Sequence, residues 1–130
     1  MLHLTFEQGE DVTTEAKPRI FSGVQPTGNI HLGNYLGAFR NWVRLQDDYD
    51  AIYCIVDLHA MTTDYEPSEL EASRLDTAKV LIALGVDPDR SLLYTQSQVP
   101  DHTELAWILG TMTPMGVLNR MTQFKDKTDK

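Results

Sequence analysis

Hydrophobic and polar positions follow two different periods along this chain, and the changes of period mark its elements. After residue 18, short apolar runs alternate with longer stretches in which apolar residues recur every three or four positions. The short runs predict buried strands, and the helical spacing predicts amphipathic helices. Pro67 stands where a helix can begin and Gly85 where one can end. The expected elements are strand Arg19–Val24, helix Leu32–Gln46, strand Ala51–Val56, helix Pro67–Leu84, strand Ser91–Gln96, a helix from Asp101 through Leu109, and a last helical turn or two around Leu118–Phe124.

The order of these elements, β-α-β-α-β-α, predicts an α/β fold with a parallel sheet and right-handed crossovers. Three such units form the first half of a doubly wound, Rossmann-like sheet. The uninterrupted apolar run Ala51–Val56 is typical of a strand that is buried on both faces. Asp101 and Glu104 have capping-box spacing, which predicts Asp101 as a helix cap. Residues 1–18 show little apolar periodicity, and we expect a mobile tail there.

Composition narrows the class of protein. The chain has 130 residues, 42% of them hydrophobic and 23% charged, which describes one ordinary globular unit. No apolar run approaches the roughly 18 residues that a membrane span needs, and the acidic beginning does not resemble a signal peptide. These features exclude a membrane protein and a disulfide-stapled secreted domain. The single cysteine, Cys54, lies in an apolar run, so we expect a buried, reduced thiol.

Charge is unevenly distributed. The net charge of -8 argues against a chain that binds nucleic acid over its whole surface. The segment from Asp47 to Glu104 contains 13 acidic and 3 basic residues, whereas residues 112–130 contain 4 basic and 2 acidic residues. Either a frayed tail or a contact for phosphates explains the basic end. Its cluster consists of Arg120, Lys125 and Lys127.

The loop after the first predicted strand is the most informative segment. Ligands of doubly wound sheets bind beyond the carboxyl ends of the strands. Four glycines lie within residues 23–37, and His31 stands where the next helix opens. Free amides and the positive dipole end of a helix favour an anion such as phosphate. The spacing fits neither a dinucleotide fingerprint nor a P-loop. The residues alone leave two interpretations, a phosphate-facing turn or a tight turn with a capping histidine.

The sequence gives the two tryptophans a packing role and shows no metal site. Trp42 and Trp107 lie at helical spacing, so we expect both to pack. No cluster of histidine, cysteine or carboxylate side chains has the spacing of metal ligands.

Several ordered segments carry a family resemblance. His31-Leu32-Gly33-Asn34 looks like the His-Ile-Gly-His signature of class I aminoacyl-tRNA synthetases. The string from Phe21 to Gly28, followed by Gly33 to Ala38, resembles the bacterial-type tryptophanyl-tRNA synthetases more specifically. Similar segments follow at residues 54–60, 85–88, 96–100 and 120–125. The resemblance covers about residues 19–128 and identifies them with the amino-terminal part of the catalytic domain.

The resemblance implies a ligase that activates L-tryptophan with ATP and then transfers the tryptophanyl group to tRNA(Trp). Mg2+ would be carried with ATP. The family members are cytoplasmic homodimers, and the segment from Trp107 to Phe124 matches the region near their subunit interface. Catalysis would consist of positioning and of stabilising negative charge on phosphoryl oxygens.

The same resemblance assigns roles to residues of this chain. The implied catalytic residues are His31, Gln25 and Lys127. The implied ATP-binding residues are Gln25, Pro26, Thr27, Gly33 and Asn34. The implied tryptophan-binding residues are Phe21, Gly23, Gln25, Val56 and His59.

One family feature does not occur in the sequence. The second signature, Lys-Met-Ser-Lys-Ser, is absent. We therefore expect residues 19–130 to form the amino-terminal half of the catalytic domain, with little or no activity alone. Two alternatives stay open: another nucleotidyltransferase with a similar loop, and a non-catalytic binding or assembly module.

Overall fold

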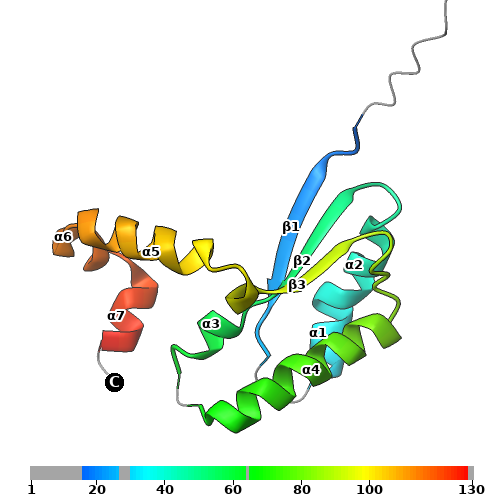
Figure 1. Ribbon diagram of the computed structural model, residues 1–130, viewed down its shortest axis with the longest axis horizontal. Helices are drawn as coiled ribbons and strands as arrows, with labels where there is room; N and C mark the ends of the chain where they lie inside the picture. The colour runs from blue at the N-terminus through cyan, green and yellow to red at the C-terminus, as the bar shows by residue number, and fades with distance from the viewer. Residues whose placement is uncertain (1–15, 27–29, 64, 129–130) are drawn as a thin grey trace, which may run out of the picture.

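The computed structural model describes residues 16–26, 30–63 and 65–128, with side chains as far as residue 126. Residues 1–15 of the predicted tail lie outside this range. The described part contains a parallel sheet in the order β1-β2-β3, which confirms the predicted α/β class (Figure 1). Its strands are β1 (Arg19–Val24), β2 (Asp50–Ile55) and β3 (Leu92–Thr95).

Helices connect and follow the strands, as the chain order predicts. The helices are α1 (Leu32–Asn34), the π-helix η1 (Tyr35–Phe39), α2 (Arg40–Leu45), α3 (Asp57–Ala60), α4 (Pro67–Ala83), the 3-10 helix η2 (Gln96–Gln98), α5 (Asp101–Met112), α6 (Met115–Leu118) and α7 (Thr122–Thr128).

The core lies between β2 and the helices that cover one face of the sheet. Phe39, Trp42, Tyr53 and Leu81 are all buried there. The rings of Trp42 and Tyr53 stack with centroids 4.5 Å apart, and the Tyr53 hydroxyl donates to the Trp42 carbonyl at 2.7 Å. Burial raises the pKa of Tyr53. The predicted packing role of Trp42 is confirmed.

A buried amide joins the end of α2 to the turn after α4. Gln46 is 2% exposed, and its Nε2 donates to the carbonyls of Val43 and Gly85 at 3.1 and 3.0 Å. Its Oε1 accepts from the Asp87 amide at 2.7 Å and from the Ser91 hydroxyl at 3.0 Å. This one side chain therefore satisfies polar groups of three separate segments.

Gly85 ends α4 as predicted. Its φ of 108° lies in the left-handed region that favours glycine. The Val86 amide donates to the Leu81 carbonyl, and the Gly85 amide donates to the Ile82 carbonyl, both at 3.0 Å. These two bonds form a Schellman cap.

The predicted helix Leu32–Gln46 is interrupted. Five of its residues, Tyr35–Phe39, form the π-helix η1, between α1 and α2. A π turn adds one residue to the i→i−4 ladder, which changes the phase of the side chains that follow. Phe39, at its end, is buried. The prediction of one regular helical period over the whole segment is therefore wrong.

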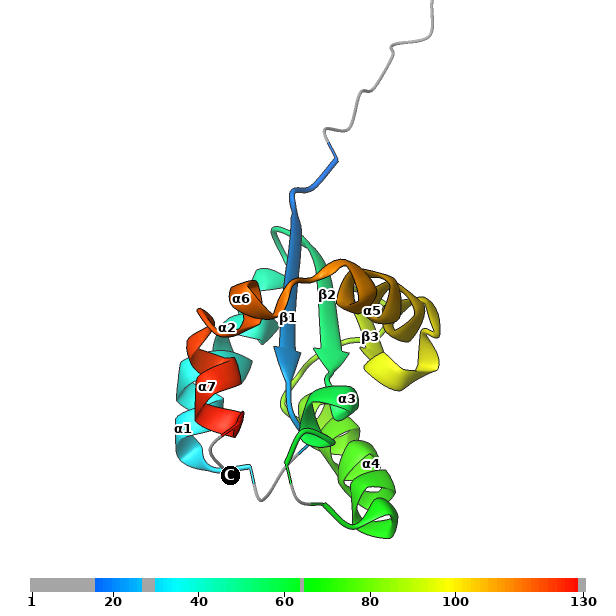
Figure 2. The ribbon, with the colours of Figure 1, turned by 90° about the vertical axis from the view of Figure 1, so that its left-hand side faces the viewer.

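Two predictions for the second half of the chain are also wrong. Asp101 is the first residue of α5 rather than its cap, because the helix begins after Pro100, whose carbonyl accepts from the Thr103 amide and hydroxyl. Trp107 is 76% exposed, since α5 projects away from the sheet (Figures 1 and 2). The predicted last helical turn or two around Leu118–Phe124 correspond to the end of α6 and the start of α7.

A buried carboxylate ties together the elements at the carboxyl end of β2. Asp57 is 2% exposed. Its Oδ1 accepts from the amides of Leu58 at 3.1 Å and Ser97 at 3.0 Å, and its Oδ2 accepts from the Ser97 hydroxyl at 2.5 Å. Arg74 of α4 donates to the same Oδ2 at 3.1 Å. The carboxylate thus connects α3, α4 and η2.

The electrostatics of Asp57 favour its charged form. Burial alone would raise the pKa of this carboxyl, but the hydrogen bonds from Ser97 and the nearby Arg74 guanidinium outweigh that cost. The net result is a pKa below the usual range. The charged carboxylate is therefore part of the folded structure.

Replacing the buried amide tests its role in stability. We expect Gln46→Met to lower the free energy of unfolding by about 2–3 kcal/mol, because it leaves buried partners of Gln46 without hydrogen bonds. Urea denaturation measures this. Gln98→Met, on the exposed surface of η2, is the control and should change stability by less than about 0.5 kcal/mol. Equal losses of unfolding free energy in Gln46→Met and Gln98→Met would contradict a stabilising role of the buried amide.

Replacing the buried carboxylate tests the Asp57 network. We expect Asp57→Asn to lower the free energy of unfolding by about 3 kcal/mol at neutral pH, since it removes a buried charge from hydrogen-bonded partners. The folded pKa is lowered, so this stabilisation is present above the ordinary carboxyl pKa of about 3.9 and is lost as the pH falls through the folded value. The difference in unfolding free energy between the wild type and Asp57→Asn should therefore become smaller below about pH 4.

The exposed Asp48→Asn is the matched control for this pH series. It should leave the unfolding free energy nearly unchanged at neutral pH. If the difference in unfolding free energy between the wild type and Asp57→Asn stays constant down to about pH 2, the charge of Asp57 is not the source of the stabilisation.

Candidate functional site

The candidate site lies where β1 and β2 end at the same edge of the sheet. Gly23 pairs with Cys54 in the parallel register, and the Val56 amide donates to the Val24 carbonyl at 2.9 Å. A Cβ atom on Gly23 would stand 3.0 Å from Val56 Cγ1 and 3.3 Å from the Cys54 carbonyl oxygen. The structure thus brings Gly23 and Val56 together, and a side chain at position 23 would crowd this edge.

The face of the sheet opposite the core helices is open among the described residues. Phe21 is 64% exposed, whereas Ile20, on the other side of β1, packs against the core. Phe21 pairs with Ile52, which is half-buried, and Leu92 of β3 is also exposed. Phe21 is therefore not part of the core. It forms an apolar surface beside Gly23.

Hydrogen bonds at the start of α1 hold His31 in a defined orientation. His31 Nδ1 accepts from the Gly33 amide at 3.1 Å, and Asn34 Oδ1 accepts from the His31 amide at 3.0 Å. The pair forms a capping box. Because Nδ1 is an acceptor, a neutral His31 ring carries its proton on Nε2.

Gly33 is constrained by the same ring. A Cβ atom at this position would lie 2.9 Å from His31 Cε1. The absence of a side chain lets the ring cap the helix. His31, Gly33 and Asn34 therefore lie together at the helix opening, with the His31 side chain exposed.

The other residues expected to contact ATP are only partly described. Gln25 is exposed directly after β1, and Pro26 is buried. Thr27 and the side chain of Lys127 lie outside the described residues. Arg120 and Lys125 are exposed at the far end of the chain. Figure 1 shows α7, the helix that contains Lys125, well apart from α1.

His59 lies on α3, beyond the carboxyl end of β2. Its side chain is exposed, and Nδ1 lies 3.0 Å from Oε1 of Gln96 in η2. Gln96 belongs to a segment that resembles the family, but the resemblance assigns it no role. The position of Gln96 directly after the third strand could have identified it as a site residue, because parallel strands end at one edge of the sheet and ligands bind there.

Cys54 is a structural residue. Its thiol is 1% exposed, which confirms the predicted burial. Burial raises the pKa of this thiol. The hydrogen bond between the side chains of Cys54 and Tyr94 is the main cause that raises the pKa of Tyr94 to about 12. A thiol with a raised pKa is a poor nucleophile at neutral pH.

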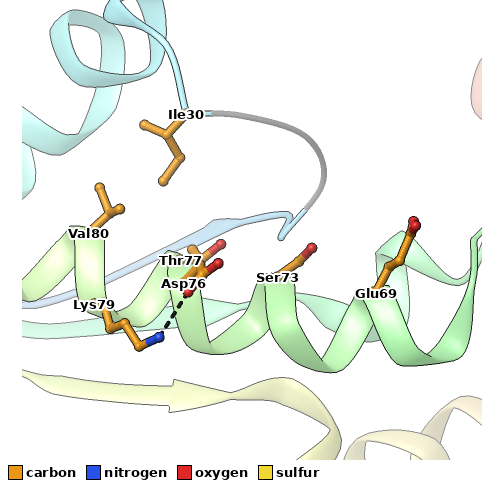
Figure 3. A pocket seen from close by; sticks show the side chains of 7 residues that line it. All are labelled: Ile30, Glu69, Ser73, Asp76, Thr77, Lys79 and Val80. Atoms are coloured by element: carbon orange, nitrogen blue, oxygen red, sulfur yellow. Dashed lines mark hydrogen bonds and ion pairs between the residues drawn. The ribbon is translucent and has the colours of Figure 1, made fainter.

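A groove of about 710 Å³ runs beside the helix opening, between Ile30 and α4 (Figure 3). Glu69 and Asp76 supply carboxylates to its lining, and the Lys79 amine already pairs with Asp76 at 2.9 Å. Two carboxylates and one paired lysine do not suit a phosphate. The phosphate-compatible group is instead the Nε2–H of the His31 ring, because the amides of His31 and Gly33 already donate within the capping box.

The described residues provide neither a metal cage nor a membrane span. Within them, no group of three or more histidine, cysteine or acidic side chains could hold a metal ion. The helices of this part of the chain are also too short or too polar to cross a membrane.

The chain is similar to known proteins over nearly its whole length. Residues 13–130 match the family described as tRNA synthetases class I (W and Y). The chain is 53% identical over 124 residues to a tryptophan--tRNA ligase from Corynebacterium glutamicum, a match that covers 95% of this chain and 36% of the relative. It is 56% identical over 112 residues to a tryptophan--tRNA ligase from Clostridium tetani, a match that covers 86% of this chain and 33% of the relative.

A solved structure shares the fold. The Campylobacter jejuni tryptophanyl-tRNA synthetase complexed with ADP and tryptophan superimposes with a TM-score of 0.79 at 39% identity. The match covers 85% of this chain and 35% of that structure. The chain thus spans about a third of the length of the curated relatives it matches. With the family match extending over nearly all of its residues, the chain belongs to the class I tRNA synthetases of the tryptophan and tyrosine type.

Proposed function

We propose that this chain contributes to the ATP-dependent activation of L-tryptophan and the transfer of the tryptophanyl group to tRNA(Trp). The proposal rests on the His31 capping box at the start of α1 and on the Gly23–Val56 contact at the end of β1, the element that precedes α1 in the chain. The His31 capping box suits an anion, and the Gly23–Val56 contact borders an apolar surface. The names of the relatives, and the complex of the similar Campylobacter jejuni enzyme with ADP and tryptophan, support this pairing of ligands.

In the proposed first step, a tryptophan carboxylate oxygen attacks the α-phosphorus of ATP. The new P–O bond forms as the bond to pyrophosphate breaks, which gives tryptophanyl-adenylate and pyrophosphate. The described residues near the loop offer donors rather than a nucleophile. His31, protonated on Nε2, can donate to a phosphoryl oxygen as negative charge develops there.

The proposed ATP contacts combine the loop residues Gln25, Pro26 and Thr27 with Gly33 and Asn34 of the helix opening. Gly33 has no side chain to obstruct a nucleotide. A contribution of Lys127 to the phosphates requires α7 to approach α1 from the position that it has in Figure 1. Mg2+ would arrive with ATP and neutralise its phosphate charge, since the described residues contain no protein cage for it.

The proposed tryptophan pocket uses Phe21, Gly23, Gln25, Val56 and His59. Phe21 offers an exposed aromatic face, and Gly23 leaves room beside Val56. In the second proposed step, the 2′-hydroxyl of the tRNA end attacks the tryptophanyl carbonyl and releases AMP. The compartment that we propose for this reaction is the cytoplasm, where a single buried cysteine stays reduced.

We also propose a homodimer built on α5 and the helices that follow it. Every residue of α5 is exposed in the described structure, including Trp107 at 76% and Met112 at 74%. Leu105, Ile108 and Leu109 are each more than half exposed. A patch of this kind marks an interaction surface.

The reaction is tested by tryptophan-dependent exchange of labelled pyrophosphate into ATP in the intact protein. We expect exchange with tryptophan and little with tyrosine. Exchange that prefers tyrosine would refute the proposed substrate. Absence of exchange with every amino acid, with ATP still bound, would favour another nucleotidyltransferase.

The tryptophan pocket is tested by Gly23→Ala. We expect tryptophan affinity to fall roughly tenfold or more, because an added Cβ lies 3.0 Å from Val56 Cγ1 and overpacking costs about 1–3 kcal/mol. Calorimetry with tryptophan and with ATP separates the two ligands, and ATP affinity should be unchanged. Gly37→Ala is the control, since its Cβ would meet no atom within 4 Å. Unchanged tryptophan affinity in Gly23→Ala would contradict the pocket.

The dimer is tested by the double substitution Trp107→Ser and Met112→Ser. Sedimentation velocity should show a dimer for the wild type and a monomer for this variant, because two large apolar side chains leave the contact. Leu75→Ser, on the exposed surface of α4, is the control and should remain dimeric. A variant that still dimerises at micromolar concentration would refute the assignment of this surface.

A further inference from the structure

The pair formed by His59 and Gln96 determines where the imidazole carries its proton. His59 Nδ1 lies 3.0 Å from Gln96 Oε1. An amide oxygen only accepts hydrogen bonds, so Nδ1 must donate. A neutral His59 ring then has an unprotonated Nε2. Among the described residues, this Nε2 has no hydrogen-bond partner, and the side chain is exposed at the sheet edge.

The buried Asp57 network holds both members of this pair. Gln96 directly precedes Ser97, whose amide and hydroxyl donate to the Asp57 carboxylate at 3.0 and 2.5 Å. His59 follows Asp57 by two residues on the single turn of α3. Arg74 donates to the same carboxylate and to the Ser97 hydroxyl, at 3.1 and 3.3 Å. The contact between His59 and Gln96 therefore depends on a buried, fully bonded anchor.

We infer that Gln96 is a positioning residue that holds His59 in the Nδ1–H tautomer, so that Nε2 accepts a hydrogen bond from an N–H group of tryptophan. This inference rests on the proposed function. Tryptophan carries two kinds of N–H donor, the α-ammonium and the indole nitrogen, and neither can accept. The opposite tautomer would present a donor to a donor, and only the Nδ1–H form makes the pair complementary.

The two histidines of the site have opposite tautomers for a local reason. His31 Nδ1 accepts from a backbone amide, which leaves Nε2–H to donate. His59 Nδ1 donates to an amide oxygen, which leaves Nε2 to accept. An Nε2 donor suits a phosphoryl oxygen, and an Nε2 acceptor suits an amine or indole nitrogen. Each ring is thus prepared for a different ligand before that ligand binds.

Nitrogen NMR of the histidine rings tests the tautomer without any ligand. The intact protein is labelled with 15N in its histidines, at a pH above the ordinary imidazole pKa of about 6.5. His59→Gln assigns the signals by their loss. We expect protonated Nδ1 and unprotonated Nε2 for His59 in the wild type and in Gln96→Glu, which keeps an acceptor oxygen. Gln96→Leu should shift the ring toward Nε2–H, and the matched control Gln98→Leu should not. A wild-type His59 protonated on Nε2 would overturn the inference.

Tryptophan binding tests the consequence. Gln96→Leu should weaken tryptophan binding roughly fivefold, the loss expected for one net hydrogen bond, while ATP affinity stays unchanged. Gln98→Leu should bind tryptophan as the wild type does. Loss of the Nδ1–H tautomer in Gln96→Leu with unchanged tryptophan affinity would overturn the inference.

Two analogues identify the donor. Indole-3-propionate lacks the ammonium, and 1-methyltryptophan lacks the indole N–H. Whichever analogue is insensitive to Gln96→Leu lacks the group that His59 recognises. Equal sensitivity of both analogues and tryptophan would overturn the inference. If the wild type shows the expected tautomer but binds no tryptophan, the proposed function fails while the positioning of the ring by Gln96 stands.

Discussion

The buried carboxylate of Asp57 is the interaction on which the geometry of the sheet edge depends. A charge at 2% exposure is unfavourable unless it is fully paired, and here an arginine, a hydroxyl and two backbone amides supply the partners. These partners come from α3, α4 and η2, which are far apart in the chain. Because all of them must reach the same two oxygens, the elements that carry His59 and Gln96 have little freedom to shift.

The two faces of the sheet have different physical roles. On one face, η1, α2 and α4 bury Phe39, Trp42 and Leu81 against β2, and the buried Gln46 closes the corner between them. On the other face, Phe21 stays exposed beside Gly23, where a side chain would be crowded by Val56. The covered face supplies stability, and the open face leaves an apolar surface where we propose that the aromatic ligand binds.

The helix opening and the α3 turn complete this edge with two differently prepared imidazoles. The capping box fixes the acceptor nitrogen of His31, and Gln96 fixes the donor nitrogen of His59. Both assignments follow from the hydrogen bond that one ring nitrogen makes within the protein. Such preorganisation lowers the cost of ligand binding, because the ring does not have to reorient or exchange its proton on contact.

The order of strands and helices, the parallel sheet, the glycine end of α4 and the buried thiol all followed from the sequence, since each depends on local periodicity or on one residue type. The loop that contains His31 was also identifiable from its glycines and from the helix that follows. The π-helix η1, the short helix α3, the exposure of Trp107 and the absence of an Asp101 cap did not follow, because each depends on what neighbours the segment meets or lacks in space. Only the tertiary structure joined Asp57 to Arg74 and Ser97, and Gln96 to His59, because contacts between residues 17 to 40 positions apart are set by strand register and helix packing rather than by local pattern.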